Sequence, residues 1–146
     1  MNKGAKLSDD HHVVRHVPSK KLIRDDDEKV IGFFATAFAP RPKDEGSISV
    51  NWIEYYKDEY AKNVNHTIDL MRKTRTISKN SAFGIGNIGN IKRICQEYGS
   101  PVRVAFAGNN PNLSHSLIRD LVPEELSLLE ILSTDAFELI LNSDTP

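Results

Sequence analysis

Residues 30–56 read VIGFFATAFA, PRPKDEG and SISVNWIEYY, so two runs rich in β-forming residues flank a charged connection with two prolines. In the second run Ile48, Val50 and Trp52 alternate with polar residues, which is the period of a strand with one face in a core. The first run is apolar at successive positions, as is typical of a strand covered on both faces. We therefore expect the two runs to pair antiparallel at the centre of a small sheet.

The patterns outside this pair predict an α+β fold, because strand-like and helix-like periods follow one another along the chain. Strands are expected at 11–17 and 102–107, helices at 57–74, 91–98 and 123–140, and one helical turn at 113–120. The expected fold is a small, mostly antiparallel sheet of about five strands with two or three helices packed on it.

Length and composition indicate one ordinary globular domain. The chain has 146 residues, a formal net charge of −1 and a single cysteine, Cys95, which excludes an internal disulfide framework. We expect a flexible N-terminus at 1–10, one domain at 11–142 and a tail at 143–146. No apolar run is long enough for a membrane span, so a cytoplasmic protein without a membrane association is expected.

The segment 84–89 matches the spacing Gly-x-Gly-x-x-Gly of dinucleotide-binding loops. Such a loop requires an acidic residue about twenty positions later, and Asn109 stands there instead. The sequence therefore favours a second interpretation, in which Gly84 and Gly86 allow a close backbone approach in a strand. We expect no cofactor.

Histidines cluster at the first expected strand, where His12 and His16 share one face. Four residues span about 13 Å along a strand, which is too far for two ligands of one metal ion. We therefore expect no metal site here, and we consider His12 a candidate general base or hydrogen-bond partner. No acidic residue can be assigned from the sequence to orient it.

A polar strand face supplies further candidates for a substrate cleft. Ser49 and Asn51 project from the face opposite Trp52, and Arg41 lies between two prolines nearby. Arginine, serine and asparagine together suit a phosphate or carboxylate group. With His12 and Arg41, His115 completes the set of candidate catalytic residues, and Ser49 and Asn51 are candidate substrate-binding residues.

Charge is distributed unevenly along the chain. Residues 57–103 hold nine basic and four acidic side chains, whereas residues 104–146 hold one basic and seven acidic side chains. The basic run at Arg72, Lys73 and Arg75 is a candidate nucleic-acid contact, although no aromatic residue is interleaved with it.

The last expected helix has more apolar residues than one buried stripe requires. Leu128, Ile131 and Leu132 lie outside the main stripe and are candidate interface residues. The leading hypothesis is therefore a small accessory subunit that binds a protein partner or a second copy through this helix or a sheet edge. The alternatives are a small enzyme acting on a phosphate-bearing or nucleotide substrate, and a nucleic-acid-binding domain.

Overall fold

The computed structural model describes residues 1–146 and has the α+β class expected from the sequence. Its main sheet has six antiparallel strands, rather than about five, in the order β6-β7-β4-β1-β5-β8. These strands are β1 (His12–Val17), β4 (Ile48–Trp52), β5 (Ala82–Asn87), β6 (Arg103–Phe106), β7 (His115–Arg119) and β8 (Phe137–Leu141). The α-helices are α1 (Tyr60–Thr74), α2 (Ile88–Glu97) and α3 (Leu126–Ile131).

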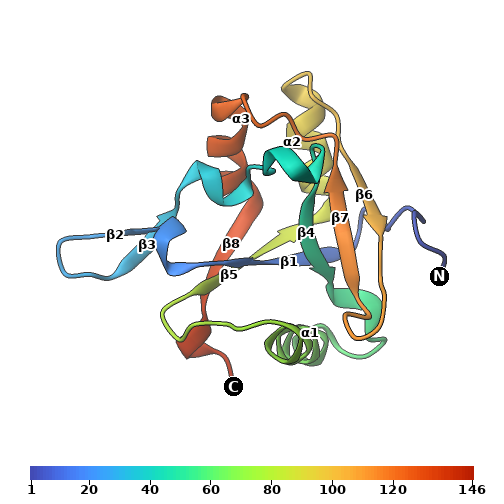
Figure 1. Ribbon diagram of the computed structural model, residues 1–146, viewed down its shortest axis with the longest axis horizontal. Helices are drawn as coiled ribbons and strands as arrows, with labels where there is room; N and C mark the ends of the chain where they lie inside the picture. The colour runs from blue at the N-terminus through green and yellow to red at the C-terminus, as the bar shows by residue number, and fades with distance from the viewer.

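Helices cover both faces of the sheet (Figure 1). Helices α2 and α3 lie on one face, where the main core contains 25 buried residues. Helix α1 lies on the other face, over a smaller core of six residues. The α1 face is therefore less completely filled by apolar side chains, and polar side chains of β1, β4 and β7 occupy the remainder. No helix in the structure is long and apolar enough to cross a membrane.

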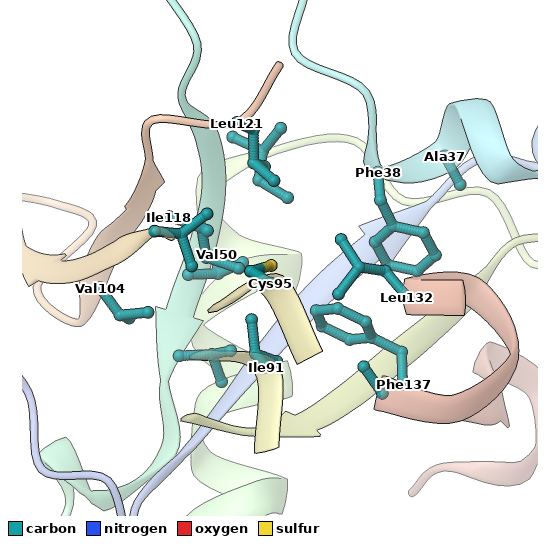
Figure 2. Packing of buried hydrophobic residues seen from close by; sticks show 14 of the residues in the cluster. Ala37, Phe38, Val50, Ile91, Cys95, Val104, Ile118, Leu121, Leu132 and Phe137 are labelled. Carbon is teal, nitrogen blue, oxygen red and sulfur yellow. The ribbon is translucent and has the colours of Figure 1, made fainter. Parts of the chain in front are cut away.

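The predicted central pair between the two runs of residues 30–56 is wrong. The first run forms β3 (Val30–Phe33), which pairs with β2 (Leu22–Arg24) in a separate hairpin, while β4 pairs with β1 and β7. After β3 the chain forms a 3₁₀ turn at Ala35–Phe38. This turn directs Phe38 into the core, where its ring centroid lies 4.4 Å from that of Phe137 (Figure 2). A continuous apolar run does not distinguish between these two ways of burying its side chains.

The predicted last helix is also interrupted. Helix α3 ends at Ile131, a π-helical turn follows at Leu132–Ala136, and β8 then pairs with β5 along the edge of the sheet. This pairing requires glycine in β5, because a Cβ on Gly86 would lie 2.9 Å from the Ala136 carbonyl oxygen. The glycines thus permit a close backbone approach, and that approach turns a segment with a helical apolar pattern into a strand.

Two further segments differ from their expected roles. Residues 113–120, expected to contain one helical turn, instead contain the whole of β7. Near the N-terminus, Leu7 is buried and its amide donates to the Val104 carbonyl, and Lys6 forms a bridge with Ala105. The packed part of the chain therefore extends N-terminal to residue 11 along the outer side of β6.

Candidate acid–base site

The strand β1 carries polar side chains at both ends of its α1 face. His12, Val14 and His16 project from the same side of β1, and Val14 belongs to the small core under α1. Because His12 and His16 are about 13 Å apart along the strand, the candidate residues fall into two separate groups.

The first group is built on a contact between His12 and Glu54. The Nδ1 atom of His12 lies 2.7 Å from Oε2 of Glu54, and the backbone amide of His12 donates to Oε1 at 2.7 Å. Glu54 lies in the 3₁₀ turn Ile53–Tyr55 directly after β4, and the pairing of Val13 with Trp52 brings this turn level with His12. Both carboxylate oxygens thus hold one residue, which fixes the position of the imidazole.

A cleft of about 420 Å³ lies beside this pair. Tyr60, from the first turn of α1, contacts the His12 ring edge to face, with 4.9 Å between the centroids. Burial raises the pKa of Tyr60, and the charges of Glu54 and Glu138 raise it further. The remaining polar side chains of the cleft are Asn87, Asn90, Thr134, Asp135 and Glu138.

This arrangement has the elements of acid–base chemistry. With Glu54 accepting the Nδ1 proton, the Nε2 atom of neutral His12 is left as a proton acceptor. The raised pKa keeps the Tyr60 hydroxyl protonated at neutral pH, so it is a hydrogen-bond donor. The acid that sequence reasoning did not assign is therefore Glu54. It is the only acidic residue of the run 47–56, but its contact with His12 depends on strand pairing between distant segments.

The second group contains three of the predicted residues. Ser49 Oγ lies 3.1 Å from Nε2 of His115, and the side-chain amide of buried Asn51 donates to Asn112 Oδ1 at 2.7 Å and Ser114 Oγ at 2.9 Å. The pairing of β4 with β7 places His115 opposite Asn51. The structure thus brings Ser49, Asn51 and His115 together and separates them from His12.

The other predicted residues do not form one site. Arg41 is exposed and pairs with Asp44, its Nε atom 2.9 Å from Oδ2. Among the three basic residues of the predicted nucleic-acid contact, Arg72 bonds to Asn142, Thr145 and the carbonyl of Pro146 at the C-terminal end. Lys73 is exposed and Arg75 is half-buried, so the three side chains do not present one continuous basic face.

The predicted interface residues lie in the chain's own core. Leu128 is 0% exposed and Leu132 is 2% exposed, and partly buried Ile131 packs against the same core. The expectation that these side chains are left over for a partner is therefore wrong. Helix α3 packs against the Ala35–Phe38 turn, and the π-helical turn that follows it packs against α2 and β8, so the apolar side chains of both are covered within the chain.

His16, at the other end of β1 from His12, leads to a prediction about the pH dependence of stability. Burial, together with the charges of Arg75 and Arg15, lowers the pKa of His16 from the usual 6.5 to about 4. The unfolded chain therefore binds this proton more tightly than the folded protein, and the free energy of unfolding should decrease as the pH falls from 6.5 towards 4. The expected loss from His16 between pH 7 and pH 4.5 is about 1–2 kcal/mol, because the ring is only partly buried and solvent screens part of the effect.

Urea unfolding at pH 7 and pH 4.5 measures this loss, and His16→Gln should reduce the pH dependence. His115 contributes in the same direction, since burial lowers its pKa as well, so part of the slope should remain in the variant. Equal pH dependence in the variant and the natural chain would contradict the assignment to His16.

No protein-family model matches the chain, and comparison with curated proteins and with solved structures finds no similar protein.

Proposed function

We propose that this protein is a small enzyme whose general base is His12. The observation that carries the proposal is the double hydrogen bond between Glu54 and His12 beside a cleft. One carboxylate oxygen lies 2.7 Å from the backbone nitrogen of His12, and the other lies 2.7 Å from its Nδ1 atom. Glu54 orients the imidazole and stabilises its protonated form, while His12 Nε2 removes a proton from a substrate or from water. Tyr60 donates a hydrogen bond to the oxygen on which negative charge develops.

The cleft supports a particular class of substrate. Its volume of about 420 Å³ suits a small molecule, and its acidic residues are Asp135 and Glu138, with Glu54 behind His12. Three carboxylates in and beside one small cleft repel a phosphate group and attract a cation. The proposed substrate is therefore a small polar molecule with an amine or another positively charged group, in place of the phosphate-bearing substrate expected from the sequence.

A screen of amine-bearing esters and amides for turnover tests this proposal. Loss of a general base lowers rates by roughly 10²- to 10⁴-fold, so His12→Gln should reduce turnover by that amount. Glu54→Gln should also reduce turnover, because an amide cannot stabilise a protonated imidazole as a carboxylate does.

His66→Gln is the matched control, since His66 is an exposed histidine of α1 that contacts Tyr56 and lies outside the cleft. It should retain full activity. Turnover that is equal in His12→Gln and in the natural chain would overturn the proposal, provided that the circular dichroism spectra of the two proteins agree.

A separate surface supports a second candidate function, the attachment of the protein to a partner. On the β2–β3 hairpin, Ile31 is 59% exposed, and Phe34 just after it is 48% exposed. Two neighbouring hollows share Ile23 and Phe33 from the hairpin with Ser133 and Thr134 from the π-helical turn. Exposed apolar patches of this kind favour an accessory role through the hairpin rather than through α3.

A further inference from the structure

The side chains of Arg15 and Arg75 have no carboxylate partner. Arg15 is largely buried, and its guanidinium donates only to backbone carbonyls, to Ala37 from Nε and to Ser49 from Nη1, both at 2.8 Å. Arg75 caps the C-terminal end of α1, and its half-buried guanidinium forms no hydrogen bond or ion pair within the chain. Buried charges in proteins are normally paired, and both burial and the charge of Arg75 lower the pKa of Arg15, so a bound anion would relieve an unfavourable interaction.

The course of the sheet explains why this space is polar. Strand β1 pairs with β4 only through Val13 and Val14, and beyond them the Arg15 side chain reaches the Ser49 carbonyl in place of a strand-to-strand bond. Figure 1 shows β4 and β7 crossing the direction of β1 and β5 at this point. The two halves of the sheet therefore diverge here, and side chains rather than a backbone ladder connect them.

Imidazole and hydroxyl groups complete this region. Ser49 Oγ and His115 Nε2 are 3.1 Å apart and both residues are partly exposed, whereas the Nε2 atom of His16 is enclosed and has no partner. Printed contacts aside, hydrogen bonds join Arg15, Ser49 and His115 in series, and the positive charge of Arg75 lowers the pKa of Arg15, His16 and His115, so Arg75 lies near all three. We call Arg15, His16, Ser49, Arg75 and His115 the basic cluster.

We propose that the basic cluster is a binding site for a phosphate group. Arg75 offers its unengaged planar fork, and the Ser49 hydroxyl, which pairs with His115 in the unliganded protein, can turn to donate to the anion. Arg15 uses Nε and Nη1 on two carbonyls, whereas no hydrogen bond occupies its Nη2 group, so it contributes positive charge and a free donor group. The nearest acidic side chain that acts on Arg15, Asp44, is held by Arg41 and does not occupy this position.

This site is independent of the proposed acid–base cleft. It lies at the opposite end of β1, beside the last turn of α1, whereas the cleft lies beside the first turn. Its charge is also opposite, because the cleft is acidic and the basic cluster contains no carboxylate. Failure of one proposal therefore leaves the other intact.

Isothermal titration calorimetry with inorganic phosphate at low ionic strength tests the site. The full chain should bind one phosphate in a saturable manner, and Arg75→Gln should weaken binding at least tenfold. Ser49→Ala should weaken it by a smaller factor, because a neutral donor contributes less than a charged one. Arg103→Gln is the control, since Arg103 is an exposed arginine paired with Asp120 on another strand pair.

Stability provides a second readout that a purely structural role of Arg75 would not give. Without phosphate, Arg75→Gln should be at least as stable as the natural chain, because the substitution removes an unpaired charge. Phosphate should raise the melting temperature of the natural chain but not that of the variant. Displacement of phosphate by glycerol 3-phosphate would identify the ligand as a phosphate group on a larger molecule, and absence of displacement as the free anion.

Two results would overturn the proposal. One is the absence of saturable phosphate binding, or binding that Arg103→Gln weakens as much as Arg75→Gln does. The other is strong destabilisation of Arg75→Gln without phosphate, which would assign Arg75 to the support of the fold.

Discussion

Leu128→Glu is expected to abolish folding at room temperature. The Leu128 side chain is fully buried between α3 and the sheet, in the same cluster as Leu132 and Phe137. Removal of a buried leucine costs about 2–5 kcal/mol, and a carboxylate at this position adds a desolvation penalty of several kcal/mol. The sum approaches the 5–15 kcal/mol by which domains of this kind are typically stable.

Circular dichroism and urea unfolding measure this result, and Leu126→Glu is the matched control. Leu126 belongs to the same helix but is 57% exposed, so its substitution should change stability by no more than about 0.5 kcal/mol. If Leu128→Glu remained folded and lost only self-association, Leu128 would instead lie at an interface. That outcome would restore the role predicted for Leu128, Ile131 and Leu132 from the sequence.

Trp52→Ala should destabilise the protein by about 3–5 kcal/mol. Trp52 is 7% exposed, and its indole nitrogen donates to Nδ1 of His11 at 3.1 Å. Its ring lies against Tyr55 and Phe106, with centroid distances of 6.1 and 6.0 Å. The substitution removes these contacts and leaves a cavity where the turn after β4 meets β6.

The urea midpoint of the variant, followed by circular dichroism, gives the size of this effect. Trp52→Phe should cost less, since it retains an aromatic ring and loses mainly the bond to His11. Fluorescence offers a separate check, because Trp52 is the only tryptophan and its emission in the folded protein should be that of a buried ring. A loss below 1 kcal/mol in Trp52→Ala would show that the ring is not part of the core.

Burial of Trp52 could be predicted from the sequence because it follows from a local pattern. The alternation of Ile48, Val50 and Trp52 requires only that one strand has an apolar and a polar face. The same reasoning predicts α1, where Ile68 and Met71 recur at helical spacing and are buried as expected. Strands 11–17 and 102–107 also correspond to β1 and β6, with boundaries that differ by one residue.

The candidate site could be predicted only in part. The alternating pattern of β4 predicts that Ser49 and Asn51 share one face of the strand. Their contacts with His115 and Asn112 could not be predicted, because they depend on which strand pairs with β4. The link between His12 and Glu54 spans 42 positions, and no pattern in either segment indicates it. Periodicity gives the face of a strand but not the identity of its neighbour.

The sequence by itself determined the α+β class, the amphipathic helix α1 and the inward face of β4, because each depends on a period within one segment. Only the tertiary structure decided that residues 30–33 pair with β2, that residues 137–141 form a strand, and that the Arg15 guanidinium bonds to backbone carbonyls without a carboxylate partner. The physical reason is that apolar runs of four to five residues satisfy helix and strand equally well. Backbone pairing with a distant strand then decides whether such a run becomes a helix or a strand. For β8 this pairing is possible because Gly84 and Gly86 of β5 have no side chains to block the close approach.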